Sequence, residues 1–214
     1  DLLFKIENFK NKIADFCDCE NACATSDAYK LEPFLKESAK TKFNKNKHLK
    51  IVNTGTIEKF YMRWGKREMT YLRHKYLFPI VNRKEFLDAF QNSYGKKSIQ
   101  PKIIMKGLNL LDVCLDQEGV VIPGKTTLII THSDVKKLKL LLAVLNSKLA
   151  FFYIKERYTA SSYNLGTTFT RDMINNLPMP QLSKAEQEHL TSIVEKTLSV
   201  TSFDDYYENR EKQA

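Results

Sequence analysis

The alternation of apolar and polar positions along the chain predicts a mixed α/β fold. In the C-terminal half, short runs rich in β-branched and aliphatic residues predict strands at 102–105, 111–115, 120–122 and 126–131. From Val135 to about Arg157 the pattern changes and predicts one long helix. Because this segment is apolar almost all round over Leu138–Leu149, we expect the helix to be buried. Ser133 or Asp134 is suited to cap its first turn.

The remaining elements are shorter. Apolar spacing predicts a lead-in helix within Leu2–Ile13, a strand over Ile13–Cys19, and a strand over Leu49–Asn53 that ends in a turn at Gly55. Arg83–Phe90 and Arg171–Asn176 are typical of short helices. A final amphipathic helix is predicted over Lys184–Ser199, and its apolar face would consist of Leu190, Ile193, Val194 and Leu198. We expect the chain beyond it, residues 201–214, to fray.

The positive charge of the chain is local. Residues 1–100 hold 20 Lys and Arg against 12 Asp and Glu, whereas residues 101–214 hold 14 against 13. Between Lys40 and Lys75 there are eleven basic residues and only two acidic ones, Glu58 and Glu68. A concentrated basic segment attracts polyanions and gains free energy from counterion release when it contacts phosphates. Charge alone therefore indicates either a nucleic-acid surface or a solvated lysine-rich loop.

Composition restricts the setting of the protein. The apolar runs Leu140–Leu145 and Leu149–Ile154 are far shorter than a membrane span, so we expect no contact with a membrane. The four cysteines lack the pattern of a disulfide scaffold, which favours a reducing, cytoplasmic compartment. The chain starts at Asp1 rather than at a methionine, and we expect it to be part of a longer protein.

One stretch imitates a phosphate-binding loop. Gly119-Val-Val-Ile-Pro-Gly-Lys-Thr126 satisfies the pattern GxxxxGK[ST], in which backbone N–H groups cradle phosphates and a helix begins at the Ser or Thr. Here Pro123 removes one donor, and the β-branched segment after Thr126 predicts a strand instead of a helix. We therefore do not expect nucleotide binding at Lys125.

Two groups of residues imitate metal sites. Asp112 or Asp116 together with Asp134-Val-Lys136 imitates the carboxylate and DxK arrangement of Mg²⁺-dependent nucleases, but Asp134 lies where a helix begins and is better explained as its cap. Three cysteines, with a fourth or a histidine, could bind zinc, but their spacing is unusual for such a site. These cysteines are Cys17, Cys19, Cys23 and Cys114. We expect no metal and no other cofactor in this chain.

No catalytic motif remains. The chain has neither a GxSxG nucleophile elbow nor the glycine loop and Asn/Asp-Pro-Pro-aromatic motif of an adenine methyltransferase, so we expect it not to be an enzyme by itself. A binding surface is the remaining interpretation. The segment Tyr61–Arg67 interleaves aromatic rings with cationic donors, and Ser161–Thr168 offers several short polar side chains. The alternative is that Tyr61 and Trp64 belong to the core and that the polar segment is only a connection.

Several stretches, taken in order, resemble the target-recognition region of TaqI-like DNA adenine methyltransferases. They are Ile51-Val-Asn-Thr-Gly-Thr-Ile57 with Trp64-Gly65, Pro101-Lys-Ile-Ile-Met-Lys106, Asp112-Val-Cys-Leu-Asp116 and Pro123-Gly-Lys-Thr-Thr-Leu128. The segment Leu142–Tyr153 and the exit Thr167–Leu177 with Pro178-x-Pro180 are similar to the same domains and to type I restriction specificity subunits. The resemblance covers roughly residues 13–199.

The resemblance implies an α/β (α+β) domain with a twisted, mostly antiparallel sheet packed against the long buried helix, followed by the C-terminal amphipathic helix. It divides the chain into a lead-in (1–12), a target-recognition domain (13–182), the last helix (183–200) and a tail (201–214). It also implies sequence-specific recognition of double-stranded DNA by the specificity fragment of a restriction-modification methyltransferase. The catalytic domain of that parent chain would bind S-adenosylmethionine, and a fused nuclease domain would use Mg²⁺.

The residues that we expect to contact DNA combine this resemblance with the chemistry of their side chains. They are Arg63, Lys66, Arg67, Lys102, Lys125, Thr126, Ser161, Ser162, Tyr163, Asn164, Thr167 and Thr168. The alternatives are a protein–protein interaction module and a cryptic Mg²⁺-dependent nuclease.

Overall fold

Two four-stranded sheets form the centre of the protein. The computed structural model describes residues 2–158, 162–163 and 166–201. The first sheet is antiparallel throughout and has the order β12 (Val113–Asp116), β10 (Lys102–Lys106), β14 (Thr127–Thr131) and β2 (Cys19–Asn21). The second has the order β13 (Val121–Pro123), β4 (His48–Val52), β9 (Pro79–Asn82) and β3 (Lys36–Glu37), and only its β13–β4 pair is parallel. The α/β class and the mostly antiparallel pairing are thus confirmed, with two principal sheets in place of the single one predicted.

The side-chain alternation of β10 explains how the layers are held together. Ile103 and Met105 belong to the core cluster on the side of the C-terminal helices, whereas Ile104 joins Val52 and Val121 of the second sheet in another cluster. Successive residues of a strand point to opposite faces, so this buried apolar run contacts a different layer with each face. The first sheet is therefore covered by helices on one side and by the second sheet on the other.

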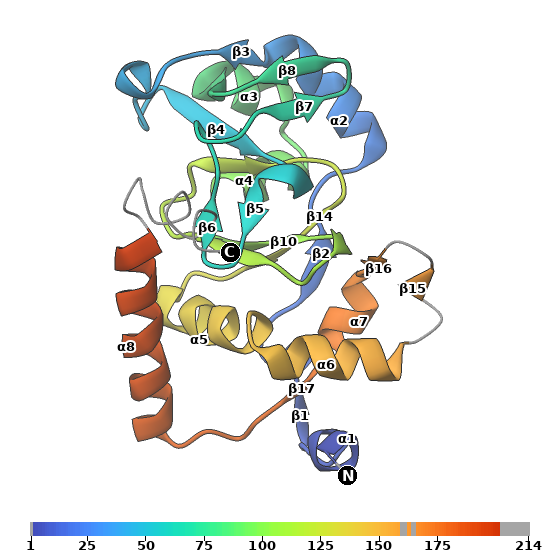
Figure 1. Cartoon of the computed structure of the whole chain (residues 1–214). Helices are drawn as coiled ribbons and strands as arrows, with labels where there is room; N and C mark the ends of the chain where they lie inside the picture. Colours follow the sequence, from blue (N-terminus) through green and yellow to red (C-terminus); the bar gives the residue numbers. More distant parts are fainter. Residues whose placement is uncertain (1, 159–161, 164–165, 202–214) are drawn as a thin grey trace, which may run out of the picture.

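Helices form the two outer layers. The outer side of the second sheet packs on α2 (Thr25–Leu31), α3 (Arg83–Ala89) and α4 (Ser93–Ser98). The first sheet packs on α5 (Val135–Leu145), α6 (Lys148–Arg157) and α7 (Arg171–Asn175), and α8 (Lys184–Thr201) lies along α5. Figure 1 shows α2 and α3 above the sheets, with α5, α6 and α7 below them.

Short elements complete the fold. A lead-in helix α1 (Leu2–Glu7) contacts α6. Small two-stranded sheets are formed by β1 (Asn11–Lys12) with β17 (Pro178–Met179), by β5 (Ile57–Glu58) with β6 (Tyr61–Met62), and by β7 (Met69–Tyr71) with β8 (His74–Tyr76). A three-stranded ribbon has the order β11 (Leu108–Asn109), β16 (Gly166–Thr168) and β15 (Ser162–Tyr163). In the described part of the chain, no helix combines the length and apolar character needed to cross a membrane.

The prediction of one long helix from Val135 to Arg157 is wrong, because the segment forms two helices that separate at Asn146. The amide of Asn146 bonds the backbone of Val113 in both directions: its Oδ1 accepts from the Val113 N–H at 3.1 Å, and its Nδ2 donates to the Val113 carbonyl at 2.9 Å. Ser147 then caps α6, and its Oγ accepts from the Ala150 N–H at 3.1 Å. Apolar periodicity does not reveal such a break, because both helices contribute apolar residues to the same core cluster.

Two smaller expectations also differ from the structure. The strand expected over Ile13–Cys19 is a 3₁₀ turn at Ile13–Asp15 followed by β2, which begins only at Cys19. On α8, Val194 is buried as predicted, but Ile193 of the predicted apolar face is 45% exposed. The tail expected to fray lies, apart from Thr201, outside the described residues.

Candidate nucleic-acid interface

Thr126 joins three loops at one edge of the two sheets. It lies in the turn between β13 and β14, where its Oγ1 is 2.9 Å from the Oγ1 of Thr54. The hydroxyl of Thr54 also donates to the Thr126 carbonyl at 3.1 Å, and the N–H of Gly107 donates to the same carbonyl at 3.0 Å. The turn with Lys125, the loop with Thr54 and the β10–β11 connection are therefore held together by hydrogen bonds.

The backbone at this junction is strained. Thr126 adopts a φ of 65°, which is a genuine outlier for a β-branched residue. Gly107 is required beside it, since an added Cβ would lie 2.4 Å from the Thr126 carbonyl oxygen. Strain of this kind persists only where the surrounding structure over-determines the conformation, and it concentrates at functional loops. Lys125, immediately before Thr126, is exposed.

A basic hairpin borders the same loops. In β7 and β8, Met69 and Tyr71 are buried and hold the hairpin, and the Nδ2 of Asn53 donates to the Thr70 carbonyl at 3.0 Å. The side chains that point outward are Thr70, Leu72, Arg73, His74 and Lys75, all exposed. A two-stranded ribbon with outward polar and basic side chains has the dimensions to enter a DNA major groove. These residues are not among the contacts predicted from the sequence, although the alternation in Tyr71-Leu-Arg-His-Lys-Tyr76 could have indicated them.

The third border is the small ribbon of β11, β16 and β15. Leu108 pairs with Thr168 and Asn109 with Thr167, while the Phe169 N–H bonds the Gly107 carbonyl at 2.9 Å. In Figure 1 the β7–β8 hairpin lies at the top of the molecule and β15 and β16 lie at its right, and the hydrogen bonds of Asn53, Thr54 and Gly107 connect the two. We call the surface formed by Thr70–Lys75, Asn53–Gly55, Lys125–Thr126, Leu108–Asn109 and Thr168 the loop edge.

The structure describes only some of the polar residues after α6 that were predicted to contact DNA. Thr168 is exposed on the loop edge, but Thr167 is buried, because the two residues alternate along β16; the expectation that Thr167 contacts DNA is therefore corrected. The backbones of Ser162 and Tyr163 form β15, which pairs with β16. Ser161 and Asn164 lie outside the described residues.

The predicted cations of the Tyr61–Arg67 segment enter an ion-pair network centred on Glu58. The Nε of Arg63 lies 3.4 Å from Glu58, and the guanidinium of Arg67 lies 4.0 Å from it. Lys106 bridges Glu58 at 3.9 Å and Asp112 at 2.5 Å. The side chain of Arg67 is 56% exposed against 18% for Arg63, so Arg67 is the more accessible of the two to a phosphate. Lys66 lines a separate cavity beside Trp64.

Lys102 was predicted to contact DNA, and the structure contradicts this. Its side chain is fully buried, and its ammonium donates to Asp116 at 2.5 Å and to the carbonyls of Ser98 and Gln100 at 2.8 and 3.1 Å. Burial lowers the pKa of Lys102, while the Asp116 carboxylate opposes that shift. A lysine held in this way supports the core and presents no charge to a ligand.

The residues of the phosphate-loop, nuclease and zinc patterns have the following places in the structure. Lys125-Thr126 is followed by strand β14, so no helix N-terminus is present to bind phosphate. Asp134 caps α5, with its Oδ1 accepting from the Lys136 N–H at 2.9 Å. Cys17, Cys19 and Cys114 are buried thiols. Within the described part of the chain, no group of three His, Cys, Asp or Glu residues is arranged to hold a metal ion.

The α/β scaffold gathers polar and basic loops at one edge. Residues 52–179 match the family of TaqI-like C-terminal specificity domains, and the chain belongs to this family. The match includes every segment of the loop edge. Domains of this family provide sequence-specific DNA recognition in restriction-modification systems. No curated protein shows significant similarity to the chain.

Proposed function

We propose that the loop edge reads a duplex DNA sequence on behalf of an S-adenosylmethionine-dependent N6-adenine methyltransferase. The observation that carries the proposal is the junction at Thr126. Together with the Asn53–Thr70 bond and the pairing of Leu108 with Thr168, it connects Lys125, the β7–β8 hairpin and Thr168 into one surface with cationic and polar side chains. The catalytic domain of the parent chain would bind the cofactor and the same DNA, and a nuclease domain fused to that chain would add Mg²⁺-dependent cleavage.

The side chains of the loop edge suit two different tasks. Lys125 is exposed on a tight turn and would contact a phosphate as a point charge. Arg73, at the tip of the β7–β8 hairpin, carries a planar fork of donors that matches the O6 and N7 acceptors of guanine in the major groove. Thr70 and Thr168 are short enough to contact base edges or backbone on either side.

The test is a selection of bound sequences from a random duplex pool, followed by titrations of the selected duplex at several salt concentrations. Lys125→Ala should weaken binding to all sequences alike and reduce the salt slope by about one unit. Arg73→Ala should cost about 1–3 kcal/mol and relax the preference at one base pair.

The control is Lys184→Ala. Its side chain is 92% exposed at the start of α8, away from the loop edge, and it should leave binding unchanged. Absence of salt-sensitive binding at low ionic strength would favour the protein–protein interaction module instead. In the parent protein, methyl transfer from S-adenosylmethionine to adenine N6, at sites that shift with Arg73→Ala, tests the methyltransferase assignment.

A further inference from the structure

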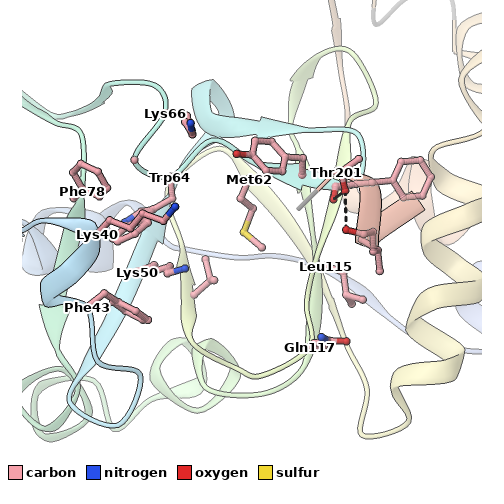
Figure 2. Close-up of a pocket in the computed structure, with 15 residues that line it drawn as sticks. Lys40, Phe43, Lys50, Met62, Trp64, Lys66, Phe78, Leu115, Gln117 and Thr201 are labelled. Carbon is pink, nitrogen blue, oxygen red and sulfur yellow. Dashed lines mark hydrogen bonds between the residues drawn. The ribbon is translucent and has the colours of Figure 1, made fainter. Parts of the chain in front are cut away.

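A cavity of about 550 Å³ lies between the second sheet and the end of α8, and it is a different feature from the loop edge. Its walls differ in chemistry (Figure 2). One wall is cationic and aromatic, and it consists of Lys40, Phe43, Lys50, Trp64, Lys66 and Phe78. The other is mainly apolar, with Met62 and Leu115, and it carries the polar groups of Gln117 and Thr201, while Val121 lies beside Lys50 on the neighbouring strand.

Lys50 is held in place on the first wall by two aromatic rings. Its Nζ lies 4.7 Å from the ring centroid of Phe43 and 4.6 Å from that of Trp64. Trp64 is itself fixed, because its indole N–H donates to the Pro79 carbonyl at 2.8 Å and its ring meets the ring of Phe78 edge-on at 5.1 Å. The ammonium of Lys50 therefore has a defined position at the cavity wall before any ligand binds (Figure 2).

The charge of the cavity selects an anion. Lys40, Lys50 and Lys66 line it, and none of the lining residues that the structure describes is an Asp or Glu. Burial lowers the pKa of Lys50, which means that its charged form lacks full hydration in this wall. An anion close to this ammonium would replace part of the missing hydration with a charge-assisted hydrogen bond.

The opposite wall of the cavity indicates which group the anion would be attached to. Met62 and Leu115 offer apolar surface, while Gln117 carries both a donor and an acceptor. A planar ring with polar edges fits such a wall better than an aliphatic chain would, because its faces contact apolar atoms while its edge meets the amide. The volume is within the range of about 300–1,000 Å³ found for small-molecule sites.

We propose that this cavity binds a nucleoside monophosphate unit, with the phosphate at Lys50 and the base between Met62, Leu115 and Gln117. The unit could be a free mononucleotide or one unpaired nucleotide of a DNA strand, since both present the same phosphate and base. The proposal does not depend on the loop edge as the duplex-reading surface, and its test uses no duplex DNA.

Trp64 provides the readout. It is the only tryptophan of the chain and lies in the cavity wall, so its fluorescence reports events in the cavity. The full chain is titrated with deoxynucleoside monophosphates, with inorganic phosphate, with uncharged nucleosides and with a short single-stranded oligonucleotide. The expected result is saturable quenching by the monophosphates, with affinities at least about tenfold weaker for phosphate alone and for nucleoside alone. Tighter binding of the oligonucleotide than of the mononucleotide identifies a DNA strand as the source, and the reverse identifies the free nucleotide.

Substitution of lysines that line the cavity tests whether the nucleotide binds there. Lys50→Gln should lower the affinity for the monophosphates by about tenfold or more, because it removes a charge-assisted hydrogen bond. Lys66→Gln, at a less buried position, should lower it by a smaller factor, and circular dichroism confirms that both variants fold. The control Lys184→Gln changes an exposed lysine outside the cavity and should leave the affinity unchanged. The proposal is overturned by absence of saturable quenching, by inorganic phosphate binding as tightly as the nucleotide, or by equal losses in Lys50→Gln and Lys184→Gln.

Discussion

The Nζ of Lys102 lies 2.5 Å from the Oδ2 of Asp116, inside the first sheet, where both side chains are almost completely buried. Asp116 also accepts hydrogen bonds from the backbone N–H groups of Val120 and Val121, at 3.1 and 3.0 Å. The pair therefore ties β10 to β12 and to the start of β13. Lys102 therefore stabilises the fold and is inaccessible to DNA, although its segment resembles a DNA-recognition region.

Removal of one partner of this ion pair should be strongly destabilising. Lys102→Ala leaves the Asp116 carboxylate buried without its cation, and we expect a loss of about 3–5 kcal/mol in the free energy of unfolding, measured by urea denaturation. Lys125→Ala, at an exposed position, should change it by less than about 0.5 kcal/mol. Equal stability of the two variants would contradict the structural role of Lys102.

Asn146 should contribute to stability through its two bonds to Val113. Asn146→Ala leaves the buried N–H of Val113 without an acceptor, while the Val113 carbonyl keeps its bond from the Phe60 N–H at 2.8 Å, so the change should cost about 1–3 kcal/mol. The matched control is Asn46→Ala, at an exposed asparagine. Thermal or urea unfolding of both variants tests this, and a loss below about 0.5 kcal/mol for Asn146→Ala would show that the helix break has another cause.

Thr126 should limit the stability of the domain. Asparagine tolerates a positive φ better than a β-branched residue does, so Thr126→Asn should relieve part of the strain at φ 65°. Because the hydroxyl contact to Thr54 is lost at the same time, we expect a net gain of only about 0.5–1 kcal/mol in the free energy of unfolding. A loss of stability would mean that the hydroxyl contact outweighs the strain.

Asp134 should act as a helix cap and not as a metal ligand. Asp134→Ala should lower the free energy of unfolding by about 1 kcal/mol, since the Lys136 N–H loses its acceptor. Incubation of the wild-type chain and the variant with DNA and Mg²⁺ provides the second readout. Cleavage by the wild-type chain that is lost in Asp134→Ala would support the nuclease alternative.

Cys23 should be the thiol that reacts first in the native chain, and slowly. Cys17, Cys19 and Cys114 are buried, whereas Cys23 is half-buried. Burial raises the pKa of Cys23 from 9.0 to about 11. The thiolate is the reactive form, and the thiolate fraction of Cys23 near pH 8 should be about 100-fold lower than that of an ordinary cysteine. The alkylation rate of Cys23 should therefore rise about tenfold per pH unit until the pH approaches its pKa. Cys23→Ser should abolish the labelling of the native chain, as measured by mass spectrometry; labelling that persists would place the reactive thiol elsewhere.

The sequence by itself determined the local elements and the family. The apolar runs of β10, β12 and β14, the strand β4 and the helix α3 were predicted close to their observed bounds, because strand and helix patterns depend on neighbours within a few residues. The cap at Asp134 and the strand after Thr126 were predicted for the same reason. Lys125, Thr126 and Thr168 were singled out from side-chain chemistry and resemblance, and all three are exposed; their contact with DNA stays a prediction.

Only the tertiary structure decided which polar residues face outward and which loops meet. Lys102 and Lys125 are the same residue type in similar surroundings along the chain, yet the first is buried against Asp116 and the second is exposed. Asn146 divides a helix through bonds to Val113, and Thr126 joins loops through bonds to Thr54; these partners lie 33 and 72 residues away. Local periodicity carries no information about such contacts, because they form only when the sheets pack and place distant backbone groups within hydrogen-bonding distance.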